Sequence, residues 1–394
     1  MELNGSSHNS QDRYPAREVE VAVVGGGPIG IEMAIALQRA GVDTILFEAR
    51  QIGEAISRWP PATHFFSSTE HVALAGVPVH NVDQLPLTGE QYLAYLRTLV
   101  EYFGIRLRNY EPVISVKREG DGFRLRTRPL RGEREYRARR VVLTTGGMAR
   151  PRLLGIPGEE LPHVSHYFPG PHTYFRTRLL VVGGRNSALE SALRSWRAGA
   201  AVTVSYRRPA FDYENLKPHL ADDMKTRLEN GEIQFLPGTA PVRITPDYVE
   251  LAYTNERYEP TGETFRHASD FVLLNTGFVA DMSLFRDAGV TLEGEQEIPC
   301  YDPATMETDV PGLYVAGTAA GGTQVKQGLR YSFYPSVTGS HTTASGDANL
   351  YNMKGGDYLT INAWPGADDG GVGLEPFETN RYTADGSAFL TDAT

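Results

Sequence analysis

Cysteine is nearly absent from this sequence: Cys300 is the only one among 394 residues. An internal disulfide and a C-x-x-C redox pair each need two cysteines, so both are excluded. A chain with so little cysteine suits a reducing compartment, and we expect a cytoplasmic protein. Cys300 stands between Pro299 and Tyr301, and we interpret it as a small apolar filler rather than a reactive thiol.

Long apolar runs are also missing. The most apolar stretch, residues 19–37, is interrupted by Glu20, by three consecutive glycines and by Glu32. A membrane span needs about 18 apolar residues, so we expect no membrane insertion. The first 17 residues are polar and lack the apolar centre of a secretory signal. We expect residues 1–17 to form a disordered tail.

Basic residues are in deficit, with 38 Lys and Arg against 48 Asp and Glu and a net charge of −10. Because nucleic acids attract a surplus of positive charge, this balance argues against general nucleic-acid binding. Arginine recurs locally through residues 124–140, where it alternates with apolar or small residues around Gly132. We favour a solvated β-hairpin there over a docking patch. No His or Cys cluster has the spacing of metal ligands, so we expect no metal site.

The length allows two or three domains at roughly 150 residues each, and the chain contains two similar units. In the first, an apolar strand over residues 19–24 leads into Gly25-Gly26-Gly27-Pro28-Ile29-Gly30, a helical pattern follows to Gly41, and a strand over 44–47 ends at Glu48. Glycines at this spacing let the backbone approach a pyrophosphate at the helix N-terminus, and the acid accepts hydrogen bonds from a ribose. This unit predicts a dinucleotide site with Gly25, Gly27, Pro28, Ile29, Gly30 and Glu48 as binding residues.

The second unit repeats this order, with a strand over residues 179–182, the turn Gly183-Gly184-Arg185-Asn186-Ser187-Ala188, a helix to Gly199 and a strand over 201–205. Tyr206 stands where the ribose-binding acid would be, and Arg207 and Arg208 follow it. Arginines without a carboxylate favour a 2′-phosphate, so we predict a preference for NADPH. Alternatively, the two arginines only decorate a strand end. The binding residues predicted here are Gly183, Asn186, Ser187, Ala188, Arg207 and Arg208.

An acid in one site and arginines in the other suggest FAD in the first unit and NADPH in the second. The sequence then resembles the thioredoxin reductase-like FAD/NAD(P)-binding flavoproteins, and within them the YpdA-type bacillithiol disulfide reductase group. Besides the two glycine-rich turns, the resemblance rests on W-P at 59–60, T-H-F-F-S-S-T-E at 63–70, H-Y-F at 166–168 with His172 and Tyr174, Y-D-P at 301–303, T-M-E-T at 305–308 and G-L-Y-V-A-G at 312–317.

The resemblance implies an α/β fold with two Rossmann-like dinucleotide-binding domains, each of three layers (ββα). It implies that the FAD domain is discontinuous, over residues 18–170 and 271–330, with an NADPH domain inserted at 171–270. Residues 141–146 and 271–277 resemble the family's two return strands. Residues 331–394 depart from the family pattern and are rich in Gly, Asp, Ser and Thr towards the end, which fits a disordered extension or a reading-frame change in the gene.

Further site residues follow from the resemblance alone. Trp59, Phe66 and Ser67, together with Phe65, would lie near the isoalloxazine, although an aromatic pair here also fits core packing. The remaining residues implied to line the cofactor sites are Thr145, Gly146, Gly277, Gly317 and Thr318. Thr318 replaces the Asp that many flavoproteins carry, and Ile29 occupies the position of the group's proposed redox cysteine. Thiol chemistry is therefore absent from that turn.

These features predict an NADPH-dependent FAD oxidoreductase in which hydride passes from NADPH to FAD. The cofactors carry the redox chemistry, so no catalytic side chain is assigned. The acceptor would be a small-molecule disulfide or a small redox protein. Two alternatives are a flavin monooxygenase and a non-catalytic FAD-binding relative. Homo-oligomer formation is left open.

Overall fold

The computed structural model describes residues 18–65, 67–323, 337–338 and 358–359, so the expectations for residues 1–17, Phe66 and most of 331–394 fall outside the described residues. The chain divides into two compact units. The first contains residues up to 57, residues 62–150 and residues from 278 onward, and the second contains residues 58–61 and 151–277. Segments 151–170 and 271–277 thus fall in the second unit, whereas the sequence placed them with the FAD-binding segments.

The strand pairing explains why these two segments fall in the second unit. β15 (Phe271–Leu274) pairs in parallel with β9 (Arg178–Val182), and β8 (Val164–Ser165) pairs in parallel with β15. Both therefore extend the sheet of the second unit. The segment read as the second return strand of the FAD domain is a central strand of the other sheet.

The first unit is built on a sheet of order β3-β2-β1-β6-β5-β4, with β19 also paired to β6. β1, β2, β3, β6 and β19 are parallel, whereas β4, β5 and β6 form an antiparallel meander. The strands are β1 (Glu18–Val24), β2 (Thr44–Phe47), β3 (Leu107–Arg108), β4 (Val113–Glu119), β5 (Gly122–Thr127), β6 (Arg134–Leu143) and β19 (Leu313–Val315). The hairpin predicted around Gly132 is confirmed by the pairing of β5 with β6.

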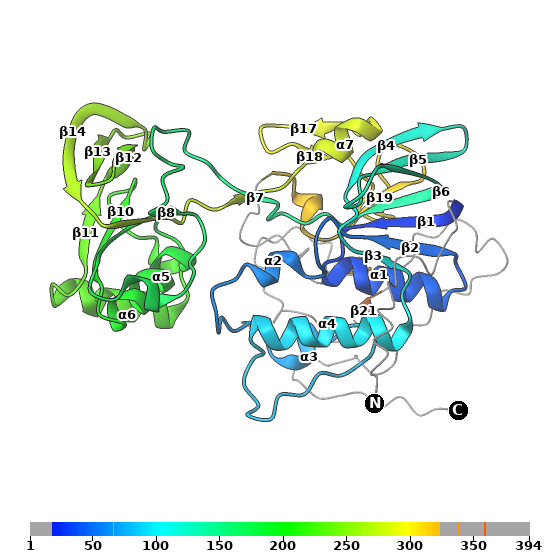
Figure 1. The fold of residues 1–394 in the computed structure, drawn as a ribbon, viewed down its shortest axis with the longest axis horizontal. Coiled ribbons are helices and arrows are strands. Elements are labelled where there is room, and N and C mark those ends of the chain that lie inside the picture. The colour runs from blue at the N-terminus through cyan, green and yellow to red at the C-terminus, as the bar shows by residue number, and fades with distance from the viewer. Residues whose placement is uncertain (1–17, 66, 324–336, 339–357, 360–394) are drawn as a thin grey trace, which may run out of the picture. The chain divides into compact units, whose positions relative to one another are not determined.

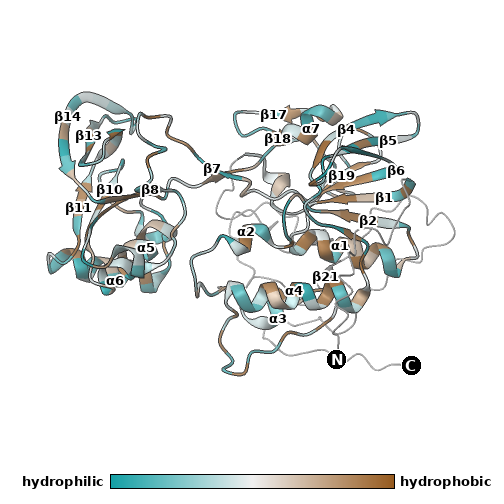
Figure 2. Cartoon of the chain, in the orientation of Figure 1, coloured by the Kyte–Doolittle hydropathy of each residue, from teal (hydrophilic) through white to brown (hydrophobic). Residues whose placement is uncertain are grey.

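Helices α1 and α4 lie on one face of the parallel strands, and the meander strands β4 and β5, with α7, lie on the other side (Figure 1). The helices are α1 (Pro28–Arg39), α2 (Glu54–Ser57), α3 (Thr69–Val72), α4 (Gly89–Phe103) and α7 (Ser283–Ala288). A capping box between Thr88 and Gln91 begins α4, and Gly104 in the left-handed conformation ends it. The inner strands β1 and β2 are apolar because both faces are covered (Figure 2).

The second unit repeats this layering, with α5 and α6 on one face of a parallel sheet and an antiparallel sheet on the other (Figure 1). The strand orders are β11-β10-β9-β15-β8 and β12-β13-β14. The further elements are α5 (Asn186–Arg197), α6 (Pro218–Glu229), η2 (Pro171–Tyr174), η3 (Tyr213–Asn215), β10 (Ala201–Tyr206), β11 (Gln234–Pro237), β12 (Thr239–Ile244), β13 (Tyr248–Thr254) and β14 (Pro260–Ala268). The predicted fold class, with two Rossmann-like domains, is confirmed.

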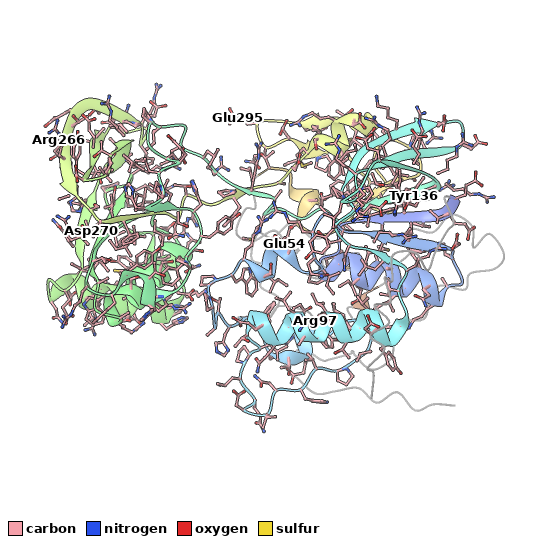
Figure 3. The ribbon with its side chains drawn as sticks, in the orientation of Figure 1. Glu54, Arg97, Tyr136, Arg266, Asp270 and Glu295 are labelled. Atoms are coloured by element: carbon pink, nitrogen blue, oxygen red, sulfur yellow. The ribbon has the colours of Figure 1, made fainter. Side chains whose placement is uncertain are left out.

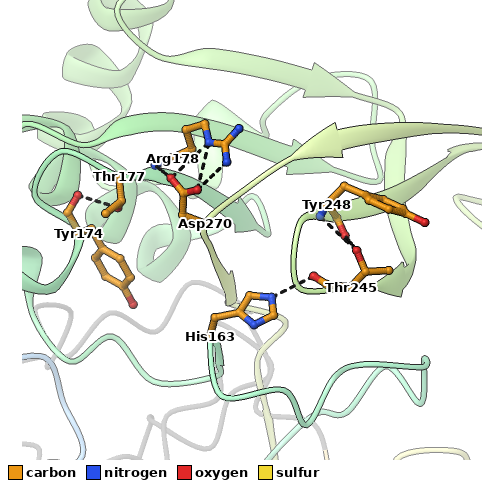
Figure 4. Close-up of polar contacts among 7 residues, drawn as sticks. All are labelled: His163, Tyr174, Thr177, Arg178, Thr245, Tyr248 and Asp270. Atoms are coloured by element: carbon orange, nitrogen blue, oxygen red, sulfur yellow. Dashed lines mark hydrogen bonds and ion pairs between the residues drawn. The ribbon is translucent and has the colours of Figure 1, made fainter.

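Polar contacts fix the starts of the central strands in the second unit (Figure 4). The backbone N–H of Arg178 donates to Asp270 Oδ2 at 2.7 Å, and its guanidinium pairs with the same carboxylate. His163 contacts the carbonyl of Thr245 through Nε2 at 3.1 Å. The Arg178–Asp270 contacts hold β9 and β15 in register at the end opposite the glycine-rich turn, and the His163 contact joins the start of β8 to the end of β12.

Short elements complete the description. β7 (Arg150–Pro151) pairs with β16 (Phe278–Val279), and β17 (Leu292–Glu293) pairs with β18 (Ile298–Pro299). η4 (Gly317–Gly321) follows β19, and β20 (Val337–Thr338) pairs with β21 (Tyr358–Leu359). Within the described ranges, no helix has the length and apolar character required to span a bilayer.

Candidate dinucleotide-binding sites

The first glycine-rich turn joins β1 to α1, as the sequence predicted. Gly25 has φ +116°, and a Cβ there would lie 2.4 Å from the carbonyl oxygen of Thr144. A Cβ on Gly30 would lie 1.8 Å from the carbonyl oxygen of Gly25. The fold itself therefore requires glycine at both positions.

Gly27 differs from these two glycines. Its φ is −75° and its ψ is −179°, an extended conformation open to any residue. A Cβ on Gly27 would meet no atom within 4 Å. Gly27 is also the N-cap of α1, and it provides no side-chain cap for the first turn. The glycine leaves open space beside a helix N-terminus, where backbone N–H groups favour an anion.

Glu48 follows β2 and lies against the turn. Its Oε2 accepts from the backbone N–H of Gly26 at 2.6 Å, and its Oε1 accepts from the N–H of Arg50 at 2.8 Å. Burial raises the pKa of Glu48, and these two hydrogen bonds oppose the rise. A carboxylate offers about four acceptor positions, so Glu48 retains capacity for ribose hydroxyls.

The second turn has the same geometry, 158 positions further along the chain. A Cβ on Gly183, whose φ is +143°, would lie 2.6 Å from the carbonyl oxygen of Asn275. Where Glu48 lies against Gly26, the ring of Tyr206 lies against Gly184, within 2.5 Å of its Cβ position. Tyr206 therefore replaces the acid in space as well as in sequence.

Helix α5 begins at this turn. Asn186 Oδ1 accepts from the backbone N–H of Lys217 at 3.0 Å, which ties the turn to the start of α6. Ala188 is buried and packs closely beneath Gly183, whereas Ser187 is exposed. Burial lowers the pKa of Lys217 to about 8.

Arg207 and Arg208 follow β10 at the same sheet edge. Arg207 is exposed, and the Arg208 guanidinium lies 5.2 Å from the centre of the Tyr258 ring. In the part of the chain that the structure describes, neither side chain forms an ion pair with a carboxylate. Both positive charges are available to an anionic ligand.

Residues that directly follow β6 and β15 lie at the carboxyl edges of the two sheets, beside the glycine-rich turns. Thr144 Oγ1 donates towards the carbonyls of Val24 and Gly25, at 3.0 and 2.8 Å. Thr145 Oγ1 and Asn275 Oδ1 are buried atoms without a hydrogen-bond partner. Buried polar atoms are rarely left unpartnered, so each marks a place for a ligand group. The sequence analysis named Thr145 but missed Thr144 and Asn275, although both directly follow an apolar strand.

Thr318 lies in η4, just after strand β19, and links it to the segment that follows β6. Its Oγ1 accepts from the N–H of Gly147 at 2.8 Å, and it lies near Gly146. Gly317 has φ +74°, and a Cβ there would lie 3.2 Å from Cγ1 of Ile29. Ile29 is buried and fills this part of the site with an aliphatic side chain. Gly277, with φ +93°, faces open space.

The four residues predicted to lie near the flavin ring fall in different parts of the structure. Trp59 belongs to the segment 58–61 of the second unit, and Phe66 lies outside the described residues. Ser67 is buried in the first unit. Phe65 packs against Tyr92 of α4 with ring centres 4.7 Å apart, which is the core-packing alternative.

Two parallel sheets, each with a glycine-rich turn at its carboxyl edge, are the architecture of a FAD-dependent NAD(P)H oxidoreductase. Residues 22–317 match the family described as pyridine nucleotide-disulphide oxidoreductase, and the chain belongs to this family. It is a FAD-dependent oxidoreductase with NADPH as its second cofactor. The acid beside one turn and the arginines beside the other fit these two cofactors.

Relatives agree with this assignment. The chain is 31% identical to bacilliredoxin reductase Bdr of Bacillus subtilis over 77% of this chain and 91% of the relative. It is 26% identical to a ferredoxin–NADP reductase of Ignicoccus hospitalis, over 76% and 89%. The structure of bacillithiol disulfide reductase Bdr (YpdA) from Bacillus cereus matches with a TM-score of 0.72 and 32% identity, over 78% of this chain and 92% of that one. The thioredoxin reductase of T. acidophilum, at 20% identity and a TM-score of 0.61, shows the shared fold alone.

Proposed function

We propose that the first unit binds FAD through the turn at residues 25–30 and Glu48, and that the second binds NADPH through the turn at 183–188 with Arg207 and Arg208. We further propose that the electrons pass to a disulfide or a small redox protein without a thiol of this chain. The names of the relatives support both acceptor classes. A chain with one cysteine fits a cytoplasmic setting.

One observation carries the FAD assignment. Gly27 is a glycine at a position where the protein's own backbone and packing require none. The second turn has Arg185 at the equivalent position, also as a helix N-cap with extended backbone. A side chain is therefore compatible with this fold, and the glycine is explained by a ligand that approaches the backbone closely.

In this proposal the residues of the chain bind the two cofactors and orient them. Glu48 would hold the adenosine ribose of FAD, the N-terminus of α1 would face its pyrophosphate, and the Thr145 hydroxyl would supply a hydrogen bond that it does not make within the protein. When bound, FAD supplies the chemistry that accepts hydride from NADPH and delivers electrons to the acceptor.

The proposal excludes a route through a protein thiol. Ile29 is buried against Gly317, and its side chain can form no thiolate. Cys300, which directly follows β18, is half-buried and has no second cysteine to pair with. A disulfide substrate would therefore receive its electrons from the flavin directly.

A matched pair of variants tests the FAD assignment. Gly27→Ala should weaken FAD binding at least about tenfold, a change of about 1.4 kcal/mol, because the new methyl group occupies the ligand's space. The flavin-free protein should melt only slightly below the wild-type temperature, since Ala in place of an N-cap glycine costs about 0.5–1 kcal/mol. FAD content after dilution and thermal melting are the two measurements.

Gly30→Ala is the control, because its methyl group would collide with the Gly25 carbonyl. It should lower the melting temperature even in the absence of flavin. If Gly27→Ala retains FAD like wild type, the assignment of this turn is wrong. Oxidation of NADPH with artificial acceptors separates the proposal from a non-catalytic FAD-binding relative.

A further inference from the structure

A buried carboxylate lies beside the edge proposed to bind FAD, at a position that was not among the predicted site residues. Glu111, between β3 and β4, is 0% exposed. Its Oε1 accepts from Thr127 Oγ1 at 2.6 Å and from the Tyr136 hydroxyl at 3.0 Å. Its Oε2 accepts from Arg134 Nη1 at 3.2 Å. All three donors lie on the meander strands β5 and β6.

Such a cluster is costly to bury. Removing the Glu111 carboxylate from water carries a desolvation penalty of several kcal/mol, which its half-exposed partner Arg134 offsets only in part, and apolar side chains of similar volume often stabilise a fold as well. Stability alone therefore explains this cluster poorly. Its connection to the cofactor site offers another reason.

The main chain around Glu111 holds Glu48 on both sides. The N–H of Glu111 donates to the carbonyl of Glu48 at 3.0 Å, and the N–H of Glu48 donates to the carbonyl of Arg108 at 2.9 Å. The N–H of Tyr110 also donates to the carbonyl of Arg50 at 2.9 Å. Arg50 is the residue whose N–H binds Glu48 Oε1. Segment 108–111 thus fixes the backbone that aims the Glu48 carboxylate.

Tyr136, whose position on the first unit is labelled in Figure 3, makes a second connection. Its ring lies edge-on to Phe47, the residue before Glu48, with centres 4.9 Å apart and an angle of 73°. Burial, followed by the charge of Glu111, raises the pKa of Tyr136. The phenol therefore stays protonated and donates to Glu111.

We infer that Glu111 is a positioning residue for FAD: through segment 108–111 it fixes the main chain of Glu48 and so the orientation of the ribose-binding carboxylate. This inference rests on the proposed function, because it requires that Glu48 binds the cofactor. Glu111 itself acts through Glu48.

The test is a double-mutant cycle on the flavin-loaded protein, with FAD release on dilution followed by flavin fluorescence. Glu48→Ala and Glu111→Ala should each weaken FAD retention, by about tenfold for Glu111→Ala. The double variant should be about as weak as Glu48→Ala alone, because Glu111 acts through that residue. Glu111→Gln keeps one acceptor oxygen and should show a smaller loss.

Asp287→Asn is the matched control. Asp287 on α7 accepts from Ser115 Oγ at 2.6 Å and from the Val116 N–H at 2.9 Å, so it also anchors the meander but makes no bond to residues 48–50. This variant should melt at a lower temperature and retain FAD normally. Thr127→Val removes a donor to Glu111 and provides the same readout if Glu111→Ala fails to fold.

Four results would overturn the inference. Losses that multiply in the double variant would show that Glu111 acts independently of Glu48. An equal loss of FAD in Asp287→Asn would show that the loss in Glu111→Ala comes from general destabilisation. Glu111 would likewise have only a structural role if its variants and Thr127→Val retain FAD at the wild-type level and melt at a lower temperature. If Glu48→Ala itself retains FAD, the proposed ribose site fails first, and the inference fails with it.

Discussion

Glu32 is a buried carboxylate in the middle of α1, the helix that begins at the FAD turn. Both of its oxygens accept from the N–H of Ala75 at 3.0 Å, and Arg39 Nη1 donates to the carbonyl of the same residue. Ala75 has φ +55°, an unfavourable left-handed conformation for a residue with a Cβ. Glu32 therefore stabilises a strained turn. Burial raises its pKa to about 7.

This shift predicts a pH dependence of stability. From the usual carboxyl pKa of 4.5 up to about 7, the folded chain keeps a proton that the unfolded chain loses. The contribution of Glu32 to stability is thus complete below pH 4.5 and falls as the pH rises through 7, by up to roughly 3 kcal/mol. Glu32→Gln should gain melting temperature relative to wild type between pH 5 and pH 8. Glu101→Gln, at an exposed position of α4, should follow the wild-type curve. Parallel curves for Glu32→Gln and wild type would contradict the prediction.

Ile29 determines which chemistry the first turn can support. Ile29→Cys would place a smaller side chain at the N-terminus of α1, where the helix dipole lowers a thiol pKa. We expect turnover of a low-molecular-weight disulfide to appear or rise in this variant, measured as NADPH oxidation. Cys300→Ser should leave the turnover of the unmodified protein unchanged. Loss of disulfide reduction in Cys300→Ser would instead show that Cys300 takes part.

At the scale of elements, the two β-α-β units differ at the end of their second strand. The acid Glu48 directly follows β2, whereas β10 ends at Tyr206, whose ring covers Gly184. This exchange removes a negative charge from an edge that also carries Arg207 and Arg208. The same fold thus offers an electrostatically different edge in each unit.

This difference predicts coenzyme preference. A hydrogen bond to a charged group contributes about 1.5–3 kcal/mol, which is about ten- to hundredfold per contact. Replacing both Arg207 and Arg208 by Ala should therefore bring kcat/KM for NADPH close to that for NADH. Arg266→Ala, on the antiparallel sheet of the same unit, should keep the preference. Equal use of both coenzymes by the unmodified protein would refute the assignment.

At the scale of the whole molecule, the repeated unit could be predicted because its signals are local. Apolar strands, a glycine-rich turn and a helical period lie within about 30 residues of each other. The boundary between the two units was harder to predict from the sequence. Strand β8 has only two residues, Val164 and Ser165, and its place in the second sheet depends on pairing with β15, which is distant in sequence. The role inferred for Glu111 was invisible for the same reason: its partners lie 16 to 25 positions away.

The pairing of β7 with β16 has an evolutionary consequence. The chain leaves for the second unit and returns from it through neighbouring strands, with the N–H of Ala149 bonded to the carbonyl of Val279 at 3.1 Å and that of Arg152 to Gly277 at 2.9 Å. For residues 151–277 the crossing into the second unit and the return from it thus lie on neighbouring strands, so this coenzyme-binding segment could be exchanged between genes without breaking the sheet of the first unit. A chain with residues 153–276 replaced by a short glycine linker should still fold, retain FAD and fail to oxidise NADPH. An exchange of this segment would change the electron donor of the flavoprotein and leave its flavin site intact.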